Sequence, residues 1–201
     1  MIETTYRPIR SANPTFEPIT VGEAKKQIEL PASYTQHDAY VEDLIKSARE
    51  ILEIDSGLVL ATGTFTLKYD EWPCGDRLEL PLRPVSTITS IQYVDNASAT
   101  QTFSSGDYSL VTHTVFPSVL LGYGKTWPSS FRGHPGDITV TLVAGYANRD
   151  AVPMAAKQAC MLLVRRMFDD RDGMERGEQD LAAYVRSYEM LVRRLQRSSY
   201  P

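Results

Sequence analysis

The sequence is poor in the residues that form covalent cross-links or hold metal ions. Among its 201 residues there are only two cysteines, Cys74 and Cys160, and three histidines. Cys160 lies in an apolar stretch with helical spacing, where a cysteine acts as a small hydrophobic residue, and Cys74 lies in a turn-like segment. We therefore expect no disulfide framework, and this cysteine usage favours a reducing compartment.

Long apolar runs are also absent. Residues 1–6 lack the apolar core of a signal peptide, and no stretch approaches the roughly 18 consecutive apolar residues that span a bilayer. We expect a chain that is made, and at first kept, in the cytoplasm, with no membrane partner.

Positive charge is in short supply over most of the chain. The whole sequence has 21 Lys and Arg against 25 Asp and Glu, a net charge of -4. Residues 1–150 carry 12 basic and 18 acidic side chains, whereas residues 151–201 carry 9 and 7. A general nucleic-acid binder would be basic, so this balance argues against bulk DNA binding. An acidic body with a mildly basic C-terminal segment predicts that this segment contacts partners.

Motifs of catalysis and metal binding are missing as well. The histidines His37, His113 and His134 are far apart, and none has a second ligand at a spacing typical of metal sites. The aspartates of residues 169–172 lack the spacing of a calcium loop, and there is no Gly-x-Ser-x-Gly elbow. We predict no catalytic residue, no cofactor and no metal ion. Carboxylates can, however, pair only in the fold, so an enzyme using His113, His134 or Asp137 stays open as an alternative.

One segment resembles part of a phosphate-binding loop. Residues 122–126 read Gly-Tyr-Gly-Lys-Thr, but the first glycine that such a loop requires is replaced by Val119. The following Trp127-Pro128 disfavours a helix where the motif needs one. We interpret the segment as an ordinary loop.

Two helices are predicted near the N-terminus. Thr20 followed by Glu23 has the spacing of a capping box, and this first helix should end before Pro31. The second helix begins near Asp38, carries an apolar stripe with helical spacing, and ends where Gly57 can form a left-handed cap.

Two more helices are predicted near the C-terminus. Val152-Pro153 opens the third helix, because proline is tolerated in a first turn, and the Asp-rich residues 169–173 break it. The fourth helix carries a long apolar stripe, with arginines on its other faces. Between the two helical pairs the apolar period changes to two, as in residues 64–69 and 138–143, which predicts strands.

The sequence therefore predicts an α+β fold. We expect a small bundle of about four helices, two N-terminal and two C-terminal, with an inserted β-rich lobe. The expected boundaries are an extended N-terminal arm at 1–18, a helical core at 19–57 and 152–198, and the β-rich lobe at 58–151.

The basic C-terminal segment supplies the candidate site. Its residues could dock an acidic partner surface or lie near DNA, although a solvated helix face is the alternative interpretation. The partner-binding candidates are Tyr188, Arg193, Arg194, Arg197 and Tyr200.

Six segments of the sequence follow one another in an order that is typical of one family. They are residues 17–25 (Glu-Pro-Ile-Thr-Val-Gly-Glu-Ala-Lys), 37–45, 80–88 (with Leu-Pro-Leu-Arg-Pro), 123–128 (Tyr-Gly-Lys-Thr-Trp-Pro), 135–146 and 152–159. Taken together over residues 17–195, they resemble the phage head-tail connector (adaptor) proteins of the phiE125 gp8 and gp6-like type. Residues 104–121 depart from the pattern, look irregular and are expected to form a variable loop.

This resemblance implies a structural role in a virion. Such adaptors form rings, commonly dodecamers, below the portal protein, and they bind a stopper or tail-terminator protein on the other side. Genomic DNA passes through the ring without sequence-specific binding, and the family has no catalytic motif. The resemblance implies a virion neck component of a tailed bacteriophage or phage-like particle. A small enzyme or a nucleic-acid-binding regulator of phage origin is the alternative.

Overall fold

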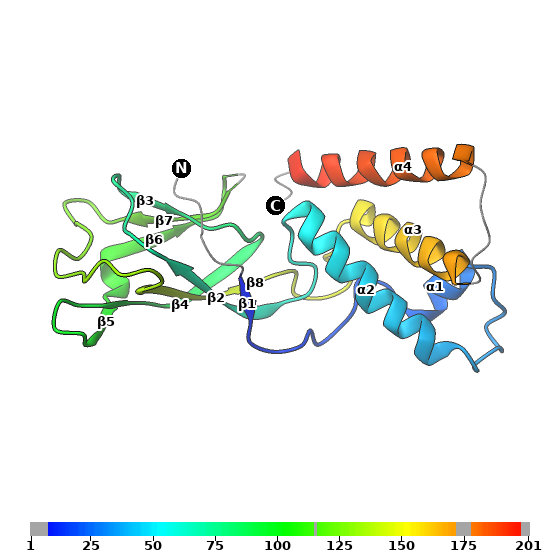
Figure 1. The fold of residues 1–201 in the computed structure, drawn as a ribbon, viewed down its shortest axis with the longest axis horizontal. Coiled ribbons are helices and arrows are strands. Elements are labelled where there is room, and N and C mark those ends of the chain that lie inside the picture. Colours follow the sequence, from blue (N-terminus) through cyan, green and yellow to red (C-terminus); the bar gives the residue numbers. More distant parts are fainter. Residues whose placement is uncertain (1–7, 115, 172–177, 198–201) are drawn as a thin grey trace. The chain divides into compact units, whose positions relative to one another are not determined.

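The chain folds into two compact units. The computed structural model describes residues 8–114, 116–171 and 178–197. Counted over these residues, a β-rich unit comprises 8–14 and 62–145, and a helical unit comprises 15–61, 146–171 and 178–197. Both helices and antiparallel sheets are present (Figure 1), so the predicted α+β class is confirmed.

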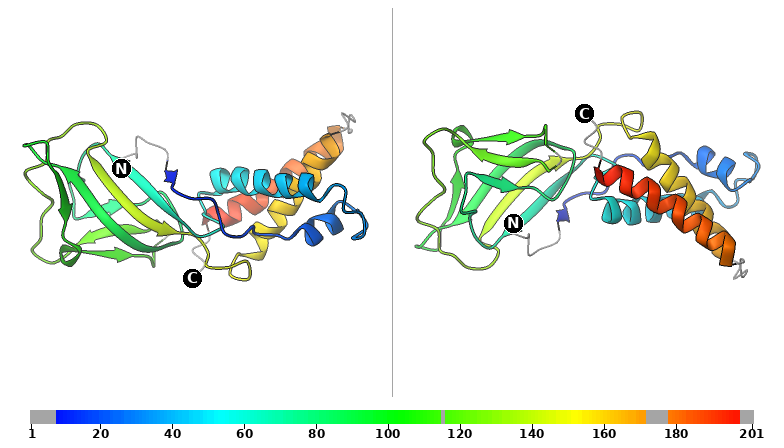
Figure 2. Two further views of the ribbon diagram at one scale, coloured as in Figure 1. Left: turned by 90° about the horizontal axis from the view of Figure 1, so that it is seen from below. Right: turned by 90° about the horizontal axis from the view of Figure 1, so that it is seen from above.

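The helical unit has a helix at each of the four places where the sequence predicts one. These are α1 (Val21–Gln27), α2 (Asp38–Ser56), α3 (Met154–Asp170) and α4 (Glu178–Arg197). Helix α2 packs most extensively on α3, and α4 packs on both of them (Figure 2).

Local hydrogen bonds begin and end the first two helices as predicted. The Oγ1 of Thr20 accepts from the backbone N of Glu23 at 3.1 Å, and the backbone N of Thr20 donates to Glu23 Oε2 at 2.7 Å. This capping box satisfies two backbone donors that the helix itself leaves unpaired. Gly57 ends α2 with a φ of 68°, in the left-handed region that favours glycine.

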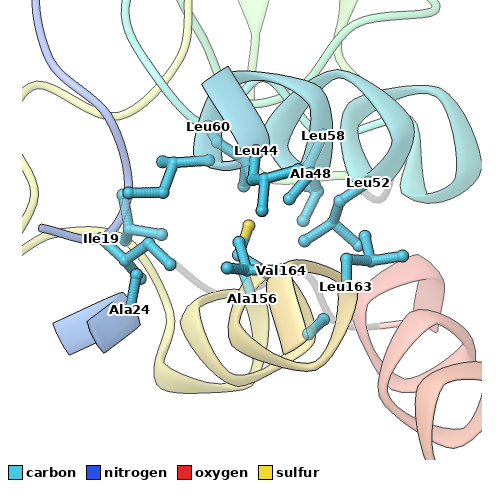
Figure 3. Packing of buried hydrophobic residues seen from close by; sticks show 14 of the residues in the cluster. Ile19, Ala24, Leu44, Ala48, Leu52, Leu58, Leu60, Ala156, Leu163 and Val164 are labelled. Atoms are coloured by element: carbon cyan, nitrogen blue, oxygen red, sulfur yellow. The ribbon is translucent and has the colours of Figure 1, made fainter. Parts of the chain in front are cut away.

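The hydrophobic core of the helical unit lies mainly between α2 and α3. The stripe on α2 meets Ala156, Ala159 and Cys160 of α3, whose small side chains let the two helices approach closely (Figure 3). Ile19, before α1, and Leu60, after α2, are 1% and 0% exposed, so the flanking segments belong to the same core. Where the burial of α4 residues is described, Val192 and Leu195 are buried and join this core.

One buried cation joins three segments of the helical unit. The side chain of Arg49, in α2, is 5% exposed. Its Nε donates to Glu17 Oε2 at 2.9 Å and its Nη1 donates to Glu53 Oε2 at 3.0 Å. Glu53 also accepts from the backbone N of Leu60 at 2.8 Å. Burial lowers the pKa of Arg49, but the carboxylates of Glu53 and Glu17 outweigh it, and the net shift is upward. The segments before α1 and after α2 are thereby fixed to α2.

The β-rich unit contains two antiparallel sheets. The five-stranded sheet has the order β1 (Ile9–Arg10), β2 (Gly63–Tyr69), β8 (Ile138–Ala144), β4 (Val85–Val94), β5 (Thr100–Phe103). The three-stranded sheet has the order β3 (Arg77–Glu79), β7 (Ser118–Leu121), β6 (Tyr108–Val111). The shorter sheet covers one face of the longer one (Figure 2), and the hydroxyl of Tyr69 in β2 donates to Glu79 O in β3 at 2.8 Å.

The central strand of the longer sheet shows why the period of two is a strong signal. Ile138, Val140 and Leu142 of β8 are each 0% exposed, while the intervening Thr139 and Thr141 are only partly buried. Strand β8 pairs with β2 on one side and β4 on the other. The predicted alternation of residues 138–143 is therefore confirmed.

Two segments have more regular structure than the sequence suggests. Within the expected arm, Ile9–Arg10 forms β1 and pairs with Phe65 and Thr66 of β2. The prediction that residues 104–121 are irregular is wrong, because they contain a 3₁₀ turn (Ser105–Asp107), β6 and β7. Strands β6 and β7 pair with each other and β7 also pairs with β3, so this segment builds the second sheet.

Candidate interaction surfaces

The residues weighed as enzymatic candidates have structural partners or lie apart. Asp137 accepts from Arg132 Nη2 at 2.7 Å and Nε at 3.0 Å, and from the backbone N of His134 at 3.1 Å. The hydrogen bond from Arg132 is the main reason that the pKa of Asp137 lies below its usual value. This pair closes the turn before β8, whereas His113 is exposed in the segment after β6.

The segment that resembles a phosphate-binding loop is fixed by its own side chains. Residues 122–126 follow β7, and the next regular element along the chain is strand β8, not a helix. The Nζ of Lys125 lies 2.6 Å from Asp107 Oδ1, and Trp127 Nε1 donates to Gly75 O at 2.8 Å. The prediction of an ordinary loop is confirmed.

Other kinds of site find no support in the part of the chain that the structure describes. No three metal-ligating side chains of residues 8–114, 116–171 and 178–197 come together. None of the helices described there has the length and apolar character needed to cross a membrane.

The inner face of α4 serves the fold of the helical unit. Tyr188 is half-buried, and its hydroxyl donates to Asp55 Oδ2 near the end of α2 at 2.7 Å. The Nε2 of Gln196 donates to Asp55 O at 2.7 Å. Burial and the hydrogen bond with Asp55 raise the pKa of Tyr188. Of the partner-binding candidates, Tyr188 is thus engaged within the chain.

The outer face of α4 combines basic and apolar side chains. Arg193 and Arg194 are exposed, and Arg193 Nη2 lies 3.1 Å from Glu189 Oε2 one turn away. Met190, between them and the start of the helix, is 66% exposed, and Val185 is 40% exposed. Arg193 and Arg194 thus lie on the exposed surface of α4. The side chain of Arg197 and the whole of Tyr200 lie outside the described residues.

A cluster of aromatic rings fills the end of the β-rich unit where β2 ends and β8 begins. The ring of Trp72 stacks on Trp127, with centroids 4.8 Å apart and planes 10° apart. The ring of Phe103 stacks on Tyr108 at 5.6 Å. We call this set the aromatic cluster; it comprises Trp72, Tyr93, Phe103, Tyr108, Trp127 and Phe131.

An open cleft of about 480 Å³ lies beside the aromatic cluster. We call it the Trp72 cleft; its lining residues are Asp70, Glu71, Trp72, Phe131, Gly133 and Pro135. The cleft therefore joins two aromatic rings to two carboxylates. Sequence reasoning missed it, because Trp72 and Phe131 are 59 positions apart and their meeting depends on the pairing of β2 with β8. The available signal was a tryptophan-proline pair in each of two turns, at Trp72 and Trp127.

The fold is similar to that of chains in gene transfer agent (GTA) particles. A chain from the neck of an empty GTA particle, computed with C6 symmetry, is 21% identical with a TM-score of 0.75. A chain from the virion of the native particle is 20% identical with a TM-score of 0.75. A chain from the native neck, computed with C12 symmetry, is 20% identical with a TM-score of 0.73. Each match covers 98% of both chains. At this identity the likeness shows the fold; no protein-family model and no curated protein matches the chain.

Proposed function

We propose that this chain is a structural component of the neck of a phage-like particle. The observation that carries the proposal is the fold, which matches chains of GTA necks over 98% of this chain and 98% of each of those chains. A match of that extent includes both units, so it does not depend on one common motif. The ordered segments that resemble head-tail connectors point to the same role from the sequence.

The finer part of the proposal is that the chain is an adaptor subunit of a ring. The ring lies under the portal protein, joins it to a stopper or tail-terminator protein, and lets the genome pass. A closed ring needs two different surfaces on each subunit that fit each other head to tail. A dodecamer is favoured by the resemblance, and the similar native neck was computed with C12 symmetry. A net charge of -4 suits a channel through which DNA slides without binding tightly.

The outer face of α4 is the proposed contact with another neck component. Arg193 and Arg194 supply charge and Met190 supplies an exposed apolar surface beside them. Such a mixture fits an acidic partner surface with an apolar centre. Arg197 and Tyr200 belong to the same proposed contact by sequence alone.

Complementation of a particle-producing strain that lacks this chain tests the proposal. The wild-type chain should restore tailed particles and co-purify with them. The double variant Arg193→Glu/Arg194→Glu should leave the chain folded but lower its incorporation about tenfold or more, because charge reversal turns attraction into repulsion. Lys46→Glu is the matched control, since Lys46 is an exposed basic residue on α2. Normal tailed particles without the chain would overturn the neck role, and equal incorporation of both variants would overturn the α4 contact.

A further inference from the structure

The Trp72 cleft has the shape and chemistry of a binding site. Its two rings, Trp72 and Phe131, lie at an angle of 64° with centroids 6.2 Å apart, so they form a corner with an apolar surface. Two acidic residues, Asp70 and Glu71, continue the lining from Trp72 along the chain. An apolar corner beside acidic groups is suited to a ligand that is both flat and positively charged.

The walls of the cleft are fixed before any ligand arrives. The carboxylate of Asp70 accepts from the backbone N of Gly136 at 2.7 Å, which ties the end of β2 to the opposite loop. That loop is closed by the double hydrogen bond from Arg132 to Asp137. Gly133 has a φ of 82°, a conformation that a residue with a side chain rarely adopts. Because these contacts already order the walls, binding loses little conformational entropy.

The charges around the cleft select the sign of the ligand. Arg132 is neutralised by Asp137, with the pKa of Arg132 raised by their hydrogen bond. Glu71 is exposed, and no ion pair with another described residue occupies its carboxylate. Asp70 is the second acidic residue of the lining. The cleft is therefore acidic, and an anionic ligand would be repelled.

We infer that the Trp72 cleft binds an arginine side chain on an exposed segment of a partner protein. Trp127 covers one face of Trp72. A guanidinium is planar, so it can lie against the rings of Trp72 and Phe131 where they line the cleft, while its N–H groups donate to the carboxylate of Glu71. A lysine ammonium offers a point charge and no flat face, and it binds more weakly in such a corner. The site belongs to the β-rich unit, so it is distinct from the outer face of α4. It does not depend on the neck role, because an isolated chain should show it.

The two tryptophans of the chain make the test direct, because both belong to the aromatic cluster. The purified full chain is titrated with the peptide acetyl-Gly-Arg-Gly-Arg-Gly-amide while tryptophan fluorescence and the two indole N–H signals in NMR are recorded. A saturable change is expected at millimolar peptide. A peptide with citrulline in place of both arginines is flat but uncharged at these positions. It should bind at least roughly fivefold more weakly, because the cation–π contact and the ion pair are lost.

Variants assign the response to the cleft. Glu71→Gln should weaken binding of the arginine peptide roughly threefold to fivefold and leave the thermal midpoint unchanged, because Glu71 is exposed. Glu79→Gln is the matched control, an exposed acid on β3 of the same unit, and should bind as the wild type does. Absence of a saturable change up to ten millimolar peptide overturns the inference, as does equal binding of the citrulline peptide or of the two variants. A different outcome is a tryptophan signal that changes when the chain alone is diluted, with no such change in Glu71→Gln. That result would show that a second copy of the chain occupies the cleft, and it would overturn the inference.

Discussion

The hydroxyl of Tyr188 on α4 donates a hydrogen bond to the carboxylate of Asp55 on α2, with 2.7 Å between the two oxygens. The residues are 133 positions apart, so this bond joins the last helix to the N-terminal half of the helical unit. It also gives Tyr188 a role within the fold, independent of any partner.

Tyr188→Phe should lower the free energy of unfolding by about 1 kcal/mol. The change removes one hydrogen bond but keeps the ring that lies parallel to Tyr184 at 6.5 Å. Urea denaturation followed by circular dichroism measures the difference. Tyr123→Phe is the control, because Tyr123 is fully exposed and its hydroxyl should contribute nothing. An unchanged stability of Tyr188→Phe would show that the bond to Asp55 is unimportant.

Arg49→Met should destabilise the chain far more, by about 3 kcal/mol or more. Removing the guanidinium leaves Glu17 and Glu53 close together without their cation, and one-sided loss of a buried ion pair is costly. Lys46→Met breaks the exposed pair with Asp43 and should cost less than about 0.5 kcal/mol. Chemical denaturation of both variants gives the comparison. Equal, small losses would mean that the Arg49 pairs do not fasten the flanking segments.

The two cysteines should react at very different rates. Cys74 is exposed, whereas Cys160 is buried in the helical core, and burial raises the pKa of the Cys160 thiol to about 12. Because the thiolate is the reactive form, an aromatic disulfide reagent at pH 8 should label one thiol per folded chain and two after unfolding. Cys74→Ser should abolish the fast reaction. Rapid labelling of both thiols in the native chain would contradict the burial of Cys160.

Stability should fall in acid, in part through Asp137. Its pKa is lowered in the fold, chiefly by the hydrogen bond from Arg132. The stabilisation is therefore present above the unfolded pKa, about 3.9, and is lost as the pH falls through the lower folded pKa. Thermal midpoints measured between pH 6 and pH 2 should decline more steeply for the wild type than for Asp137→Asn. Parallel curves would show that the carboxylate does not titrate with folding.

The sequence predicts the elements well where a local pattern decides them. The capping box at Thr20, the left-handed Gly57 and the alternation in β8 all depend on residues within a few positions of each other. The prediction for residues 104–121 is wrong because β6 and β7 are only four residues each, and β7 pairs not only with β6 but also with β3, a strand far away in the chain. Pairing between distant segments is what a local pattern cannot supply.

The candidate surfaces also differ in whether a local sequence pattern or a contact between distant segments determines them. The exposed arginines of α4 could be found from helical spacing, since the apolar stripe fixes which positions face away from the core. The engagement of Tyr188 by Asp55 could not, because it depends on how α4 packs on α2. The Trp72 cleft is likewise assembled from residues 70–72 and 131–135, which only the sheet brings together.

Imaging of assembled particles tests the neck role most directly. Particles that carry this chain, tagged at residue 1, would be reconstructed by electron cryomicroscopy without imposed symmetry at the junction of head and tail. We expect a ring at that junction, with about twelve copies by the resemblance. The helical unit and the β-rich unit should each fit its density. A chain absent from purified particles, or present only in the capsid shell or tail tip, would contradict it.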